Sequence, residues 1–520
     1  MKLKRLFISI FVLLFSFILI GCDFNFNFSN GNNPNPINGN DPDPNQNGDG
    51  SGSGQINKTE DTIYIYAVND FHGIVYEEDN SVGLSKLFGF LHAKKQEKPD
   101  NTVILSSGDM FQGSALSSMS RGELVLDAMN YAGFDAMTMG NHEFDWGLET
   151  VTRFTDGDAS NGEANFPLLG ANIIDKNTRK IADGLEPYTV IKRAGLTIGI
   201  IGIIGYGEES DILASYVSSY KFTTEINVIK QYAKILREQE KCDIVILSTH
   251  SDTSQINGEI VELTGSERID VVLNGHTHQS YYGEIGRSDS SAPMPYVQSG
   301  CYGRYVGIVT LTYDFENNKV KSASAMNSRA QNICKTADPE IDKMFTKYQE
   351  FVEIANEELG VCGFTMYQEL GGFFCADSLV EKYDVDLGVC NRGGIRGSGF
   401  PIYKDDMITY GDIFEIMPFE NKVVIVELQG SVIINKLFSG ADSYYFISTN
   451  VDVNNRTING EKIDTSKYYK VATIDYLYEK TNQPFMSGNN HIKTDDLFRD
   501  VIAWSVKENV KENGKFSYSK

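Results

Sequence analysis

Positive charge is scarce in this chain. Its 520 residues include 46 Lys and Arg against 70 Asp and Glu, which gives a formal net charge of −24. So acidic a surface argues against a nucleic-acid polymer or an anionic membrane surface as a docking partner. It does not exclude a small phosphorylated ligand, because bound divalent cations reverse the sign of the local charge.

Cysteine is also scarce, and no internal repeat is present. The seven cysteines show no CxxC or other metal-ligand spacing. Six of them follow Cys22, and an even number permits disulfides in an exported protein. We favour buried free thiols over disulfides, and nothing in the sequence indicates an obligate protein partner.

A long apolar run occurs only at the N-terminus. The fifteen residues 6–20 carry no charge, and they follow a segment that contains Lys2, Lys4 and Arg5. Fifteen residues are short for a membrane span, so a transmembrane anchor is the less favoured alternative to a signal peptide over residues 1–21. Residues 19–22, Leu-Ile-Gly-Cys, resemble the lipobox of bacterial lipoproteins. We therefore expect an extracytoplasmic protein attached to the bacterial cell membrane through a lipid on Cys22.

Residues 22–58 are predicted to be a disordered spacer. Ten Asn fall between residues 25 and 47, together with Gly, Pro, Asp and Ser. Such a segment has too little apolar surface to offset the entropy of ordering it.

From residue 62 onward, short runs rich in Ile, Val and Leu alternate with helical patterns, as in strands covered on both faces. Strands are predicted at 62–68, 103–106, 136–139, 168–171, 197–203, 243–248, 270–273 and 305–313, and helices at 84–95, 123–131 and 224–240. We predict a layered α/β domain over residues 59–336, an interdomain helix over 337–359 and a smaller α/β domain over 360–520.

Histidine, carboxylate and carboxamide side chains follow the predicted strands. The sequence reads DFHG at 70–73, GD at 108–109, GNHEFD at 140–145, TH at 249–250 and NGHTH at 274–278. The carboxyl ends of parallel strands lie at one edge of a sheet, so these groups are expected to meet. A carboxylate such as Asp109 can bridge two divalent ions, and oxygen with imidazole ligands suits Zn, Mn, Fe or Co better than Ca. Each motif alone is more typical of a structural histidine or a turn; the ordered set favours a two-metal hydrolase centre.

The same motifs resemble the signature of calcineurin-like metallophosphoesterases, strongly over residues 62–320. The sequences of these motifs are similar to those of secreted bacterial 5′-nucleotidases, a family that includes UDP-sugar hydrolases and 2′,3′-cyclic nucleotide phosphodiesterases. The resemblance implies an α/β fold, with a layered metallophosphoesterase domain followed by a smaller α/β 5′-nucleotidase C-terminal domain. It also implies two divalent metal ions, Zn, Mn or similar. One would be held by Asp70, His72, Asp109 and His278, and the other by Asp109, Asn141, His250 and His276.

The resemblance assigns further roles. His142 would donate to the phosphate in the transition state and Asp145 would orient it. In the C-terminal domain, residues 391–396 (NRGGIR) and 417–421 (MPFEN) resemble family segments that bind the nucleotide. The implied substrate-binding residues are Asn391, Arg396, Phe419, Tyr476 and Asn482.

Two departures from the family pattern concern the substrate. The family's Gly-Gly-Asp-Gly is absent after Tyr476, which leaves Asn482 at the acidic position, and an Arg expected before residue 373 is missing. The motifs favour release of phosphate from extracellular nucleotides by water activated at two metals, whereas the two departures leave the nucleotide preference open. A UDP-sugar hydrolase, a 2′,3′-cyclic nucleotide phosphodiesterase and a non-catalytic surface binding or adhesion lipoprotein are the alternatives.

Overall fold

The structure is a computed structural model that describes residues 58–78, 80–251, 254–441 and 443–520. The expected signal peptide, Cys22 and nearly all of the expected spacer lie outside the described residues. Within the described part of the chain, no helix is both long and apolar enough to cross a membrane.

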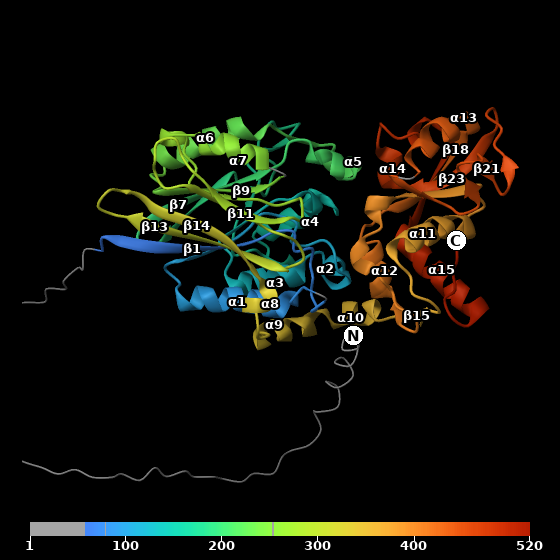
Figure 1. Cartoon of the computed structure of the whole chain (residues 1–520), viewed down its shortest axis with the longest axis horizontal. Helices are drawn as coiled ribbons and strands as arrows, with labels where there is room; N and C mark the ends of the chain where they lie inside the picture. Colours follow the sequence, from blue (N-terminus) through green and yellow to red (C-terminus); the bar gives the residue numbers. More distant parts are fainter. Residues whose placement is uncertain (1–57, 79, 252–253, 442) are drawn as a thin grey trace, which may run out of the picture. The chain divides into compact units, whose positions relative to one another are not determined.

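Two six-stranded sheets form the N-terminal part of the fold (Figure 1). In the first sheet, β1 to β4 are parallel and two antiparallel strands extend it beyond β1. In order across the sheet, its strands are β14 (Lys319–Arg329), β13 (Tyr305–Asp314), β1 (Glu60–Val68), β2 (Thr102–Ser106), β3 (Ala136–Thr138) and β4 (Leu168–Leu169).

The second sheet has four parallel strands between two antiparallel edge strands. In order, its strands are β11 (Ser280–Ile285), β12 (Met294–Ser299), β10 (Val271–Leu273), β9 (Ile244–His250), β7 (Leu196–Ile204) and β6 (Tyr188–Arg193).

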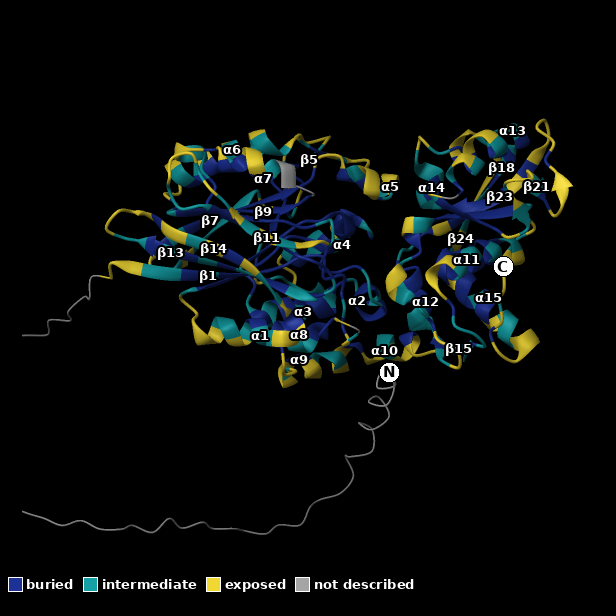
Figure 2. Ribbon diagram, viewed as in Figure 1, coloured by how far each residue is buried: buried dark blue, intermediate teal, exposed yellow. Residues whose placement is uncertain are grey.

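Alternating side chains hold the two sheets in a four-layer arrangement. Ile63 and Ile65 of β1 point into a core shared with the second sheet, whereas Val68 packs on helices α1 (Gly83–Glu97) and α3 (Glu123–Ala132). The far face of the second sheet packs on α6 (Glu225–Glu238). Figure 2 shows the strands buried between these helices, whose outer faces are exposed. Because both sheets are covered on both faces, the parallel strands are apolar throughout, as their continuous Ile and Val runs predict.

The C-terminal part contains a five-stranded sheet with its own core. The strand order is β19 (Tyr445–Ile447), β16 (Leu387–Asn391), β23 (Tyr468–Ile474), β18 (Lys422–Gln429) and β24 (Asn489–Leu497). Helices α11 (Gln368–Lys382), α12 (Tyr410–Ile416) and α15 (Phe498–Asn513) pack with it. The fold class is thus two α/β domains, as the sequence predicts.

A helical segment joins the N-terminal domain to the C-terminal domain, but it is not one helix. It consists of α9 (Pro339–Met344), a 3₁₀ turn η6 (Phe345–Tyr348) and α10 (Gln349–Ala355). Asp338 caps α9 by accepting a hydrogen bond from the Glu340 amide, with Pro339 in the first turn. Ile341 and Tyr348 pack into the core of the first domain. The domain boundaries at residues 336 and 360 stay predictions.

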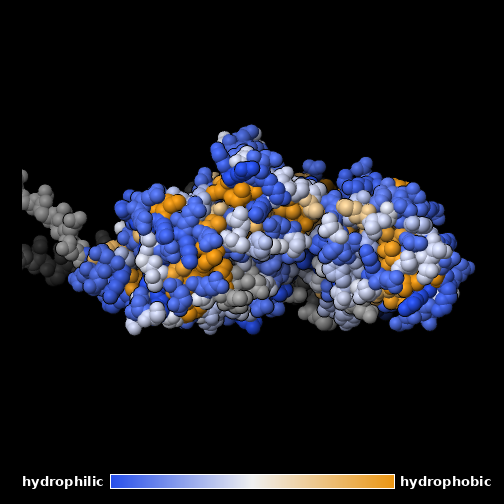
Figure 3. Space-filling model, turned by 90° about the horizontal axis from the view of Figure 1, so that it is seen from above, coloured by the Kyte–Doolittle hydropathy of each residue, from blue (hydrophilic) through white to orange (hydrophobic). Residues whose placement is uncertain are grey.

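Hydrophilic side chains cover most of the face shown in Figure 3, and apolar side chains occupy separate smaller areas.

Candidate metal centre and adjoining cavity

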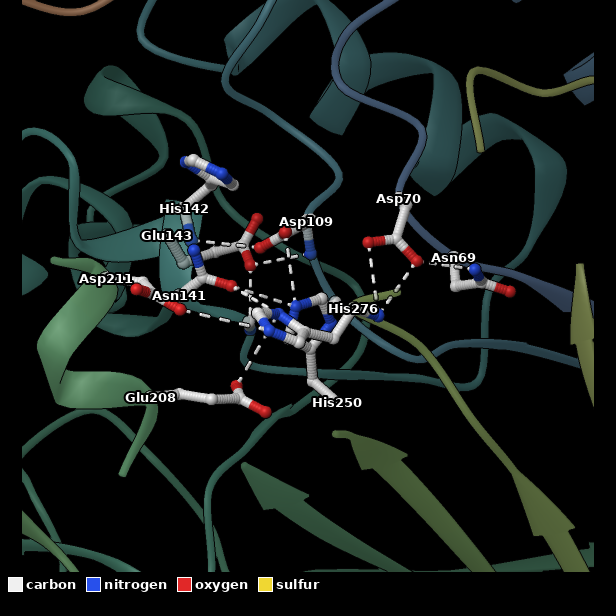
Figure 4. A network of polar contacts seen from close by, with 12 residues as sticks. Asn69, Asp70, Asp109, Asn141, His142, Glu143, Glu208, Asp211, His250 and His276 are labelled. Atoms are coloured by element: carbon white, nitrogen blue, oxygen red, sulfur yellow. Dashed lines mark hydrogen bonds and ion pairs between the residues drawn. The ribbon is translucent and has the colours of Figure 1, made fainter. Parts of the chain in front are cut away.

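The predicted ligands lie on loops that leave the carboxyl ends of parallel strands. Asp70 and His72 follow β1, Asp109 follows β2 and Asn141 follows β3 in the first sheet. In the second sheet, His250 ends β9, and His276 and His278 follow β10. The two sheets stack with these ends together, so ligands from both converge in one place (Figure 4).

Several of these loops have a backbone conformation that side-chain-bearing residues rarely adopt. A positive φ of 48° to 80° occurs at five of the predicted ligands: Asp70, His72, Asp109, His276 and His278. Such a conformation costs about 1–3 kcal/mol per residue and persists only where surrounding structure enforces it. The fold therefore holds these side chains inward at an energetic cost, which is typical of functional sites.

Asp70, His72 and His278 form one half of the cluster. Their ligand atoms lie within 4.8 Å of one another. The Nε2 atoms of His72 and His278 are 3.0 Å apart, and His278 Nε2 is 3.5 Å from Asp70 Oδ1. His72 Nε2 is also 4.0 Å from Oδ2 of Asp109, which reaches toward both halves.

Asp109, Asn141, His250 and His276 form the other half. His250 Nε2 lies 3.1 Å from Asp109 Oδ2 and 3.1 Å from Asn141 Oδ1. His276 Nδ1 lies 3.1 Å from the same Asn141 oxygen. All seven predicted ligands are thus brought together, and Asp109 lies between the two halves.

The hydrogen bonds of two rings suit metal binding. Nδ1 of His72 donates to the Gln112 carbonyl (3.0 Å), and Nδ1 of His250 donates to the Ser107 carbonyl (2.7 Å). With Nδ1 as the donor, each ring turns Nε2 toward the cluster, and a metal ligand needs this nitrogen unprotonated. Burial lowers the pKa of both rings; at His72 it prevails, but at His250 the Asp109 carboxylate outweighs it and holds the pKa well above the usual 6.5, so a bound cation would replace a proton there. Burial raises the pKa of Asp70 to about 7, and the Asp109 carboxylate adds to this rise. Lone pairs and buried carboxylates this close together fit divalent cations, because a cation offsets the cost of burying negative charge.

His142 and Asp145 form a hydrogen-bonded pair beside the cluster. Nδ1 of His142 donates to Asp145 Oδ2 over 2.7 Å. Burial lowers the pKa of His142, but the carboxylates of Asp145 and Asp109 outweigh it, so the pKa lies above its usual 6.5. The Nε2 atom lies 3.2 Å from Nη2 of Arg396, and the ring is stacked 5.8 Å from Phe419.

A cavity of about 360 Å³ adjoins the cluster. Its lining includes Asp109, Asn141, His276 and His278 from the cluster, the His142–Asp145 pair, and four predicted substrate residues, Asn391, Arg396, Phe419 and Tyr476. A larger open hollow of about 520 Å³, lined by residues between 155 and 186, contains none of the predicted site residues.

Known protein families match both parts of the chain. Residues 63–280 match the model of the calcineurin-like phosphoesterases, and residues 364–487 match the 5′-nucleotidase C-terminal domain.

The chain is a calcineurin-like phosphoesterase with a 5′-nucleotidase C-terminal domain.

Three curated relatives of this phosphoesterase are 26–29% identical to it over the aligned residues. An apyrase of Tabanus yao is 28% identical over 70% of this chain and 71% of its own length. Endonuclease YhcR of Bacillus subtilis is 29% identical over 70% of this chain but only 32% of its own length, so the chain spans about a third of that protein. A 5′-nucleotidase of Vibrio cholerae is 26% identical over 72% of this chain and 74% of its own length.

Solved structures share the fold. A 5′-nucleotidase precursor from Thermus thermophilus superposes with a TM-score of 0.72 at 19% identity, covering 86% of this chain and 96% of its own. The sulfate thiohydrolase SoxB of the same organism gives 0.64 at 14% identity, covering 86% and 94%. The family assignment makes this protein a metal-dependent phosphoric ester hydrolase, and the clustered ligands supply candidate metal sites.

One predicted substrate residue of the phosphoesterase is not brought to the cavity. Asn482 is exposed and is not among the described residues that line it. Lys480 contacts a residue of the cavity lining: its Nζ donates to the Tyr476 hydroxyl over 2.6 Å and lies 4.2 Å from that ring. Arg392, which replaces a family glycine, pairs with Glu369 at 2.6 Å and lies 4.2 Å over the Phe446 ring.

Several cavity residues were not predicted from the sequence. Asp211, Leu213, Tyr216, Glu420 and Asn421 also line the cavity. Of these, Glu420 and Asn421 fall within the quoted 417–421 segment, which could have pointed to them. The other three lie in a polar stretch after β7 that carries no recognisable motif.

Two buried glutamates of the phosphoesterase domain were missed as well. Glu143, inside the GNHEFD motif, is fully buried and accepts hydrogen bonds from the backbone amides of Asp109, Met110 and Gly140. Glu208 lies close to His276. Burial raises the pKa of Glu208 to about 8.

Proposed function

We propose that the protein releases phosphate from nucleotides, in the manner of a 5′-nucleotidase, with two divalent ions such as Zn or Mn. The observation that supports this most directly is the shared cavity. The candidate metal ligands border the same space as Phe419 and Tyr476, whose rings suit a planar base, and Arg396, whose guanidinium suits phosphate or ribose oxygens.

The residues of this chain would divide the work as follows. Asp70, His72, Asp109 and His278 would hold one ion, and Asp109, Asn141, His250 and His276 the other. When bound, the ions supply positive charge for the phosphoryl oxygens and lower the pKa of water.

Nη2 of Arg396 lies 3.2 Å from Nε2 of His142, and both residues line the cavity, where each can donate to a phosphoryl oxygen as its charge develops. Asp145 holds the His142 ring through Nδ1, which fixes the orientation of Nε2. Phosphoryl transfer depends mainly on such positioning and on neutralising charge, so no covalent phospho-enzyme is required.

A substrate panel tests the proposal. Phosphate release from AMP, UDP-glucose and a 2′,3′-cyclic nucleotide would be measured with Mn or Zn for the wild type and for His142→Ala and Asp109→Asn. His491→Ala is the matched control, because His491 is exposed, does not line the cavity and has its Nε2 on the Gly488 carbonyl. We expect AMP turnover that both site variants lose and the control retains. Turnover of none of the esters by the wild type would favour the non-catalytic binding lipoprotein instead.

We further propose that the enzyme acts outside the cytoplasm, tethered to the bacterial membrane by a lipid on Cys22. The charged start, the apolar run at 6–20 and the Leu-Ile-Gly-Cys sequence support this. Cys22→Ser should move the protein from the membrane fraction to the soluble fraction and abolish incorporation of labelled fatty acid. Retention in the membrane with no label in the wild type would refute the lipid anchor.

A further inference from the structure

Glu208 is a buried carboxylate with one oxygen unaccounted for. It begins the 3₁₀ turn η4 (Glu208–Asp211), directly after β7 and its following loop. The residue is only 8% exposed, and among the described residues its Oε2 atom has no hydrogen-bond partner. Buried carboxylate oxygens without a partner are costly, so this one calls for an explanation.

The unpaired oxygen is aimed at one half of the metal-ligand cluster. Glu208 Oε2 lies 3.9 Å from Nδ1 of His276, the nitrogen that also lies 3.1 Å from Asn141 Oδ1. The ligand atoms of Glu208, His250 and His276 all lie within 4.8 Å of one another. Figure 4 shows the Glu208 carboxylate pointing toward the two rings. Two donors on a common ion, each about 2.0–2.2 Å from it, are at most roughly 4.3 Å apart, so a separation of 3.9 Å is compatible with a shared ion.

The backbone makes room for this carboxylate. A Cβ atom on Gly205 would lie 2.1 Å from Glu208 Oε1, so only glycine leaves the space that the carboxylate now fills. Asp211, at the other end of the same 3₁₀ turn, is placed differently. It lies 4.0 Å from the other nitrogen of His276, Nε2, and its side chain is 52% exposed. Glu208 alone of the two faces the nitrogen that Asn141 also faces.

We propose that Glu208 is a further ligand of the ion held by Asp109, Asn141, His250 and His276. The inference rests on the proposed two-ion function. With Glu208 the site offers three oxygen and two nitrogen donors, more than the four of a tetrahedral zinc site. An extra carboxylate adds negative charge and hard oxygen, which favours an ion such as Mn²⁺ and raises its affinity.

The test measures binding of Mn²⁺ itself to the full-length chain, by equilibrium dialysis and by electron paramagnetic resonance of free and bound Mn²⁺. Glu208→Gln removes the charge and keeps the shape. Glu209→Gln is the matched control, since its amide oxygen can still accept from the backbone amides of Gly207 or Phe222. Gly205→Ala, which displaces the Glu208 carboxylate without altering it, is the second variant and serves also if Glu208→Gln does not fold.

We expect the wild type and Glu209→Gln to bind two Mn²⁺ ions. In Glu208→Gln and Gly205→Ala, the dissociation constant of one ion should rise about 10- to 100-fold while the other changes less than about twofold. If both dissociation constants are unchanged in these variants, or if both ions are weakened equally, the role of Glu208 is overturned while the two-ion function stands. A wild type that binds a single ion would overturn the two-ion function, and this inference with it.

Discussion

The Glu143 carboxylate joins the Asp109 loop to the Asn141 loop, so its replacement should show how much these hydrogen bonds stabilise the first domain. Its Oε2 accepts from the amides of Asp109 and Gly140, both at 2.8 Å, and its Oε1 accepts from Met110 at 2.9 Å. In Glu143→Gln the single amide oxygen can retain at most two of these bonds. One buried N–H then faces an NH₂ group, which costs about 1–3 kcal/mol. Glu143→Ala leaves three unpaired donors, so its cost should be about two to three times larger.

Urea unfolding of the metal-free protein would measure this loss. A Trp504→Phe background leaves Trp146, which is nearly buried and follows the same motif, as the reporter of the first domain. Glu149→Gln is the control, because Glu149 is exposed and accepts from the Tyr220 hydroxyl at 3.1 Å. We expect the urea midpoint to be highest for the control, lower for Glu143→Gln and lowest for Glu143→Ala. A Glu143→Gln midpoint equal to that of the control would refute the bracing role.

Three further predictions concern stability and activity. Asp270 is buried and accepts hydrogen bonds from Arg268 Nε (3.0 Å) and the Val245 amide (2.9 Å), and it forms an ion pair with Arg237. Burial raises the pKa of Asp270, but the two arginines outweigh burial and hold the pKa below the usual 3.8. Asp270→Asn should lower the free energy of unfolding by about 3 kcal/mol at pH 7. Because a lowered carboxyl pKa stabilises the fold above the unfolded value, the difference in urea midpoint should shrink as pH falls below about 3.8; a constant difference would contradict the ion-pair account. Asp145→Asn should reduce phosphate release about 10²-fold without changing the unfolding temperature, and unchanged turnover would show that the His142 ring needs no orienting carboxylate. Chelation should lower the unfolding temperature in calorimetry, and Mn²⁺ at about 100 times its dissociation constant should restore roughly 2.7 kcal/mol per site; a temperature insensitive to Mn²⁺ would argue that the cluster binds no ion.

The ligands of the centre could be predicted because they follow apolar parallel strands, and both the apolar runs and the motifs can be recognised in the amino-acid sequence. The predicted helices at 84–95, 123–131 and 224–240 match α1, α3 and α6 to within about two residues. In the two six-stranded sheets, strands β6, β11, β12 and β14 were not predicted. β6, β11 and β14 lie at or near sheet edges, are largely half-buried or exposed, and so lack a continuous apolar run. β12 is mostly buried, but its sequence MPYVQS contains a proline and two polar residues and so lacks such a run as well.

The roles of individual polar residues were harder to predict where only local geometry decides them. Glu208 and Glu209 are adjacent and chemically identical, yet the first is buried beside His276 and the second bonds to backbone amides. The left-handed turn at Gly207 (φ 94°) precedes them and helps to set which one points inward. Likewise, counting positions after Tyr476 selected Asn482, whereas the chain turns so that Lys480 contacts that ring.

The six described cysteines can serve as natural probes of unfolding. All are free and buried, as we favoured from the sequence. Burial raises the pKa of Cys242 to about 11 and those of Cys301 and Cys334 to about 12, so these thiols are protonated and shielded from reagents in the native state. Cys362, Cys375 and Cys390 occupy the core of the other domain. The rate at which each sulfur becomes alkylated would therefore time the opening of its own half of the molecule, with no engineered label.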